Sequence, residues 1–383
     1  MFIKHLRPVL LSAVVLFYAA QLSAQESLKL KFDNSIVYAG IEVGSKGVKM
    51  SLLELGKDAN STGSFNILKD SSVNTDFISF TQPTFSATLN GMSELYSTAI
   101  TRYNIPSNRI FTVVSSGVKM QAEKEEKTSW VNNLIDSFRI KIKDAQRRVE
   151  VVDPLQEARL SHLGIVPSSK RFSTFLIDIG SGNTKGGYFP FDDNTTDFKL
   201  FTFNWGTKSV ANATEKKLDE FDKTLATYKS QLNRTLLSIE NSELIYAVNS
   251  SGAYNMNDYI AFSGGIVWAA ATLLQPEQID KTVVNVTYED VQKLAEQLYT
   301  DFSSLSDVEL VKKINDPSID KAAVAKEIKR VHSVFDQKSL MAGAGLLLKI
   351  MRQFKSVYES KGFFLVKNGQ VGWVSAYVDQ TVK

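Results

Sequence analysis

Two glycine-containing turns carry the residue types that could bind an anion. They are Gly44-Ser45-Lys46 and Gly180-Ser181-Gly182-Asn183-Thr184, and each follows an apolar, strand-like run. A backbone without Cβ can approach an anion closely and direct N–H groups at phosphate oxygens, while hydroxyls add further donors. Either turn alone is more often only a turn. Two matched copies favour phosphate binding, with the phosphate held between the two tips and Lys46 adding a cation.

An acidic residue interrupts the apolar strand before each turn. Glu42 precedes the first turn and Asp178 precedes the second. A carboxylate is costly to bury unless a positive group lies nearby. A hydrated divalent cation meets that need, and Mg²⁺ prefers carboxylate and water ligands. Both residues are therefore candidate metal ligands, and the alternative for each is a salt bridge or hydrogen bonds within the turn.

The repeated strand–turn–strand pattern predicts two related lobes. The chain has 383 residues, of which 43% are hydrophobic, so it is long enough for two α/β domains. We expect residues 30–166 to form the first lobe and residues 170–383 the second. Further strands are expected at 109–115, 149–152 and 258–262, helices at 93–103, 119–145, 156–163, 211–240, 266–274, 288–300 and 340–358, and a closing hairpin joining 363–366 to 371–378 through Asn368-Gly369.

The first 24 residues have the pattern of a secretory signal peptide. Lys4 and Arg7 precede an apolar run from Val9 to Ala20, and small residues follow up to Ala24. The pattern predicts export to the periplasm or the extracellular space, with cleavage near Ala24. The alternative is a retained membrane anchor, and no other stretch is apolar enough to span a bilayer.

Composition excludes several classes of protein. The net charge is +3 from 44 basic and 41 acidic residues, which leaves no basic stripe for nucleic acid. The absence of cysteine excludes disulfides and thiolate nucleophiles, and three histidines are too few for a histidine-rich metal site. The glycine motifs of serine hydrolases, P-loop proteins and dinucleotide-binding enzymes are also absent from the sequence.

Seven segments, in this order along the chain, resemble motifs of the exopolyphosphatase and guanosine pentaphosphate phosphohydrolase family. The resemblance spans nearly the whole chain after the leader, and the order of the motifs is more specific than any one of them. The segments are Ala39–Met50, Gln156–Leu160, Leu176–Thr184, Trp205-Gly206-Thr207, Ser263-Gly264-Gly265, Leu340–Ala344 and Phe363–Gly372.

This resemblance implies a two-lobed actin-like (ribonuclease H-like) α/β fold with a phosphate-binding cleft between the lobes. It also implies hydrolysis of phosphoanhydrides assisted by Mg²⁺ or another divalent cation. Glu157 matches the family's catalytic glutamate, which activates water, Asp178 would hold the metal or its water, and Gly264 and Gly265 would complete the phosphate-binding set. Export makes polyphosphate or another extracytoplasmic phosphate compound a better substrate than a guanosine nucleotide, and a homodimer is left open.

Two positions depart from the family pattern. Lys185 stands where the family has a glutamate, and Glu42 stands where it has an aspartate. Lys185 removes a metal or water ligand and adds a charge that binds phosphate. Catalysis is therefore slowed, retuned or lost, and the alternative function is an anion-binding or scaffolding protein of the cell envelope that uses Lys46 and Lys185. We expect Lys185 to bind an anion if it points into the cleft.

Overall fold

The computed structural model describes the chain in two compact units that divide after Val151. The predicted signal peptide, Lys46 and part of the predicted closing hairpin lie outside the described residues. Among the helices described, none is both long and apolar enough to cross a membrane. The described residues are 28–45, 47–57, 65–192, 194–252, 257–355, 361–367, 369 and 372–381.

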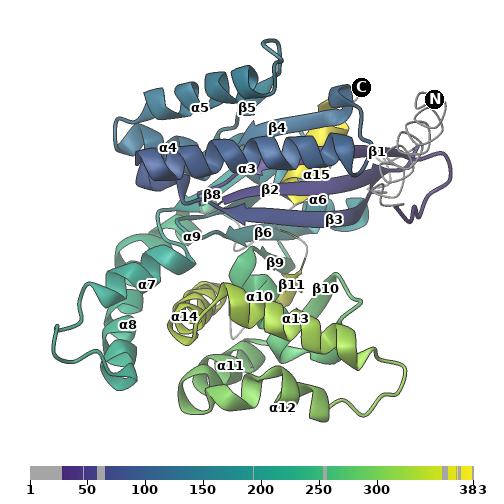
Figure 1. The fold of residues 1–383 in the computed structure, drawn as a ribbon. Helices are drawn as coiled ribbons and strands as arrows, with labels where there is room; N and C mark the ends of the chain where they lie inside the picture. The colour runs from purple at the N-terminus through teal and green to yellow at the C-terminus, as the bar shows by residue number, and fades with distance from the viewer. Residues whose placement is uncertain are drawn as a thin grey trace, which may run out of the picture. The chain divides into compact units, whose positions relative to one another are not determined.

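The first unit contains a five-stranded sheet in the order β3-β2-β1-β4-β5. β1 and β2 form the predicted antiparallel hairpin, and β1, β4 and β5 run parallel. β3 was not expected, because its sequence is polar; it pairs antiparallel with β2 at the edge of the sheet. Helix α3 packs on β1 and β2 (Figure 1). The elements are β1 (Ile36–Val43), β2 (Gly47–Leu55), β3 (Phe65–Asn74), α3 (Gln82–Thr101), β4 (Ile110–Val114), α4 (Ser116–Lys124), α5 (Thr128–Lys141) and β5 (Val149–Val151).

The second unit contains a six-stranded sheet in the order β10-β11-β9-β6-β7-β8. β6, β7 and β8 are antiparallel neighbours, whereas β6, β9 and β11 run parallel. Apart from β10, the strand order repeats that of the first unit, which confirms the predicted α/β actin-like fold of two related lobes. The strands are β6 (Thr174–Ile179), β7 (Thr184–Tyr188), β8 (Lys199–Phe203), β9 (Tyr259–Ser263), β10 (Val283–Val286) and β11 (Gly362–Val366).

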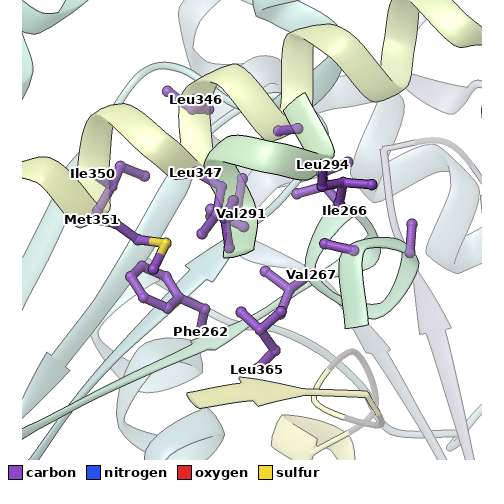
Figure 2. Close-up of a cluster of buried hydrophobic side chains, with 14 of the residues drawn as sticks. Phe262, Ile266, Val267, Val291, Leu294, Leu346, Leu347, Ile350, Met351 and Leu365 are labelled. Carbon is purple, nitrogen blue, oxygen red and sulfur yellow. The ribbon is translucent and has the colours of Figure 1, made fainter. Parts of the chain in front are cut away.

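Helices cover both faces of the second sheet. On one face α10, whose sequence is apolar almost throughout, packs with α11 and α14 over Phe262 and Leu365 (Figure 2). The other face carries α6 and α15. The helices are α6 (Pro154–Ile165), α7 (Thr207–Glu215), α8 (Leu225–Ile239), α9 (Ile245–Ser251), α10 (Gly265–Leu274), α11 (Tyr288–Thr300), α12 (Asp307–Lys312), α13 (Lys321–Val334), α14 (Gln337–Phe354) and α15 (Gly372–Thr381).

The C-terminal segment and α6 differ from the sequence-based expectation. The prediction of a closing hairpin was wrong, because residues 372–381 form the helix α15. The strand β11 already pairs with β9 and β10, so no further strand can pair with it. α6 was expected in the first lobe, but it lies in the second unit because it packs on β6, β7, β8 and α15. A Cβ on Gly164 would lie 2.1 Å from the carbonyl oxygen of Gly372, so glycine permits this close helix contact.

His162 anchors α6 to the sheet. Its ring is fully buried, and Nε2 lies 2.9 Å from the carbonyl oxygen of Thr174, the first residue of β6. The rings of Phe189 and Phe198 meet it edge-on at centroid distances of 4.9 Å and 5.8 Å. Burial lowers the pKa of His162 to about 4, against the opposing effect of the Thr174 hydrogen bond and with a smaller contribution from the Arg171 charge.

We expect this histidine to make stability depend on pH. The unfolded chain protonates His162 near pH 6.5 and the folded chain near pH 4, so its contribution is complete above pH 6.5 and declines as the pH falls toward 4. The free energy of unfolding should decrease by about 3 kcal/mol across that window. Urea unfolding of wild type and His162→Gln at several pH values checks this, since the difference between them isolates the histidine. Identical pH dependence in both proteins would contradict it.

Candidate functional site

Three charged side chains meet at the carboxyl end of β6 in the second unit. Lys185 Nζ lies 3.0 Å from Glu157 Oε1 and 3.5 Å from Asp178 Oδ2. The exposed fractions of the Lys185, Glu157 and Asp178 side chains are 7%, 4% and 17%, so the lysine and glutamate are buried and the aspartate keeps some contact with solvent. The structure thus joins three of the predicted site residues.

The strand register places two of these side chains together with Ser263. Asp178 pairs with Lys185 across the β6–β7 hairpin and with Ser263 on the parallel strand β9. Side chains alternate along a strand, and Leu176, two residues before Asp178, contributes to the apolar cluster that contacts Ile165 of α6. Asp178, Lys185 and Ser263 therefore project from the face that α6 covers.

Ser263 holds the aspartate from the side opposite the lysine. Its Oγ donates a hydrogen bond of 2.7 Å to Asp178 Oδ1, while Lys185 contacts Oδ2. Both oxygens of this carboxylate are thus engaged. The sequence pointed to the glycines after Ser263 and not to the serine itself, because serine at a strand end has many ordinary roles.

Glu157 is positioned by the start of α6. Asp153 caps the helix by accepting a 2.7 Å hydrogen bond from the Gln156 amide, and Pro154 opens the first turn. The Glu157 amide donates to the carbonyl oxygen of Asp153 at 3.0 Å. A carboxylate in the first turn is stabilised by the helix dipole, which helps to offset its burial.

The Gly180–Thr184 turn is held by the N-terminal end of α7. The carbonyl oxygen of Gly180 accepts from the Thr207 amide at 3.0 Å, and that of Ser181 accepts from Lys208 and Ser209 at 2.8 Å and 3.1 Å. The Ser181 and Gly182 amides have no acceptor among the described residues. The turn thus directs its carbonyl groups at α7 and keeps two N–H donors for an anion.

Thr184 and Asn183 shape this turn from its far end. The amide of Gly180 donates to the carbonyl oxygen of Asn183 at 3.0 Å, which closes the turn. The Thr184 hydroxyl donates to the carbonyl oxygen of Trp205 at 2.7 Å. This hydroxyl therefore fixes the turn in place, and the amide donors are the better phosphate ligands.

Gly264 and Gly265 follow directly after the carboxyl end of β9, the strand next to β6. Gly264 has φ +107° and precedes α10, which begins at Gly265. A Cβ on Gly264 would lie 2.2 Å from the carbonyl oxygen of Ile179, so both the backbone angle and the close approach require glycine. The N-terminus of α10 follows directly after Ser263, and helix N-termini favour anions.

We expect Gly264→Ala to destabilise the second unit by about 2 kcal/mol or more, because a methyl group would collide with β6 and strain the backbone. Gly182→Ala is the matched control for stability, since a Cβ there meets nothing within 4 Å. Urea unfolding of both variants measures the effect. Equal midpoints for the two variants would show that Gly264 is not required.

The first turn belongs to the other unit. The Gly44 amide donates to the carbonyl oxygen of Gly47 at 2.9 Å. Glu42 is buried on β1, paired in register with Lys49 on β2 and Val113 on β4. The cleft between the lobes stays a prediction.

A divalent cation does not fit between the carboxylates of the second unit. The ammonium group of Lys185 already contacts both Glu157 and Asp178, and two cations at the same oxygens would repel each other. The described residues include no group of three or more His, Cys, Asp or Glu side chains that could hold a metal. For Asp178, the salt bridge weighed as the alternative to a metal is the arrangement in the structure.

The fold is actin-like, and its second unit holds a glycine turn next to two carboxylates that share one lysine. No family model and no curated protein matches the sequence. Among solved structures, the Ppx/GppA family member from Aquifex aeolicus is similar at 17% identity and TM-score 0.56, covering 90% of this chain and 99% of that one.

Two further structures agree with this fold. An exopolyphosphatase-like protein matches at 15% identity and TM-score 0.59, covering 92% of this chain and 100% of its own. An exopolyphosphatase from Cytophaga hutchinsonii matches at 13% identity and TM-score 0.52, covering 90% and 98%. At these identities the likeness establishes the fold, and the chemistry must be argued from the side chains.

Proposed function

We propose that the protein belongs to the exopolyphosphatase and guanosine pentaphosphate phosphohydrolase family and hydrolyses the terminal phosphoanhydride bond of polyphosphate or a related compound. The main support is an arrangement of three features at the carboxyl end of β6 in the second unit. They are a glycine turn with two amide donors, a glutamate at the start of a helix and a buried lysine. The solved structures with this fold include exopolyphosphatases, which supports the same assignment.

Glu157 is the proposed general base. It accepts a proton from water as the water oxygen forms a bond to the terminal phosphorus. The bond from that phosphorus to the bridging oxygen breaks, and the bridging oxygen stays on the shortened chain. The products are orthophosphate and a chain one phosphate shorter, and the proton leaves Glu157 with the products.

The Ser181 and Gly182 amides would bind the oxygens of the terminal phosphate. Fixed amide dipoles stabilise a transition state because they need no reorganisation during the reaction. Lys185 would reduce the repulsion between the anionic substrate and the two carboxylates. No step of this mechanism passes through Mg²⁺, because Lys185 contacts Asp178, one of the two candidate metal ligands.

A second candidate function is anion binding without turnover. The observation that favours it is the contact between Lys185 and Glu157, since an oxygen engaged by an ammonium group is less available to a water molecule. In this case the glycine turn would bind a phosphorylated ligand, and the protein would act as a scaffold in the cell envelope. The proposal includes export, as the predicted signal peptide indicates, so either function would operate in the periplasm or outside the cell.

We expect Glu157→Gln to lower the rate of phosphate release from polyphosphate by at least about 100-fold, because the amide cannot accept the proton. Glu296→Gln, on the exposed face of α11, is the matched control and should keep the wild-type rate. Release of orthophosphate is measured with and without added Mg²⁺.

Equal rates for wild type and Glu157→Gln, or no release from either, would refute the enzymatic function. If neither protein releases phosphate, calorimetric binding of polyphosphate by both would support the anion-binding function instead.

A further inference from the structure

We propose that the Lys185 ammonium group is a permanent internal replacement for a divalent cation, so that the site binds its phosphate ligand and acts on it without metal. The identity of the ligand rests on the function proposed above, whereas the replacement of the metal rests on the ion pairs alone. The position, charge and burial of the Lys185 side chain all support this replacement.

The position is that of a bridging cation. Lys185 Nζ lies within 3.5 Å of one oxygen from each of two carboxylates that come from different elements, α6 and β6. The antiparallel register fixes the Asp178 contact, and the capped start of α6 fixes the Glu157 contact. An ammonium group directs three N–H donors, so it can serve both carboxylates at once.

The charge of the lysine offsets one of the two carboxylate charges. The two carboxylates and the ammonium group together carry a net charge of −1. A glutamate at position 185 would instead leave three negative charges, which a protein interior does not hold without a bound cation. A divalent ion bound to that cluster would give it a net charge of −1, which is the net charge that the three groups have with Lys185.

Burial distinguishes this lysine from the other cations that pair with buried acids. Glu240 is fully buried and pairs with Lys349 and Arg352, but those two side chains are 21% and 52% exposed and reach it from the surface. Lys185 is itself buried between its partners, with 7% of its side chain exposed. A metal ion at this position would have to displace an ammonium group that is itself buried between the two carboxylates.

Mn²⁺ binding to the full chain tests the proposal without requiring turnover. Free Mn²⁺ is measured by its electron paramagnetic resonance signal as each protein is titrated. The proteins are wild type, Lys185→Glu, Lys185→Gln and the charge-matched control Lys199→Glu. Lys199 is exposed on β8. We expect wild type and the control to bind Mn²⁺ equally weakly. Lys185→Glu should gain one site that binds Mn²⁺ at least about 10-fold more tightly than wild type does. The Mn²⁺ affinity of Lys185→Gln should rise by a smaller factor. Far-ultraviolet circular dichroism confirms that each variant is folded.

Phosphate release provides the second readout. Wild type should release orthophosphate from polyphosphate at the same rate, within about twofold, in EDTA and in Mg²⁺, because the lysine supplies the positive charge. Any release by Lys185→Glu should be abolished by EDTA. If wild type releases no phosphate at all, the proposed hydrolysis fails, while the Mn²⁺ titration still decides the role of Lys185.

Two results would overturn the inference. One is a wild-type protein that binds Mn²⁺ at one site as tightly as Lys185→Glu. The other is a failure of both folded variants at position 185 to bind Mn²⁺ more tightly than wild type.

Discussion

The ammonium group of Lys185 between Glu157 and Asp178 is the interaction on which the arrangement of the candidate site depends. Two carboxylates brought together in a buried place repel each other unless a cation lies between them. Here the cation is part of the chain, held by the strand register at the centre of the sheet. In the proposed function, the same charge also reduces the repulsion between the carboxylates and a phosphate anion.

The rest of the second unit fixes the geometry of this ion cluster. β6, β7 and β9 bring Asp178, Lys185 and Ser263 side by side, while α6 supplies Glu157 from above the same face. α6 is in turn held by the buried His162 and by α15. The N-terminus of α7 binds the carbonyl groups of the glycine turn, so the turn is ordered before any ligand arrives.

The sequence predicted the parts of this structure that depend on local patterns. Both glycine hairpins, the repeat of the strand–turn–strand pattern in two lobes and a helix that contains Glu157 follow from apolar runs and turn residues. Segments decided by tertiary contacts could not be predicted: β3 is polar yet completes a sheet edge, and residues 372–381 are helical because the strand edge is already filled. The salt bridge of Lys185 was equally hidden, since a lysine on a strand reveals its partners only when a helix distant in sequence packs against it.

A crystal structure determined in the presence of excess Mn²⁺ would show which cation lies between the two carboxylates. We expect Lys185 Nζ within hydrogen-bonding distance of Glu157 and Asp178, and no anomalous scattering peak of manganese between the two carboxylates. A manganese peak at that position, with the lysine side chain turned away, would contradict this expectation.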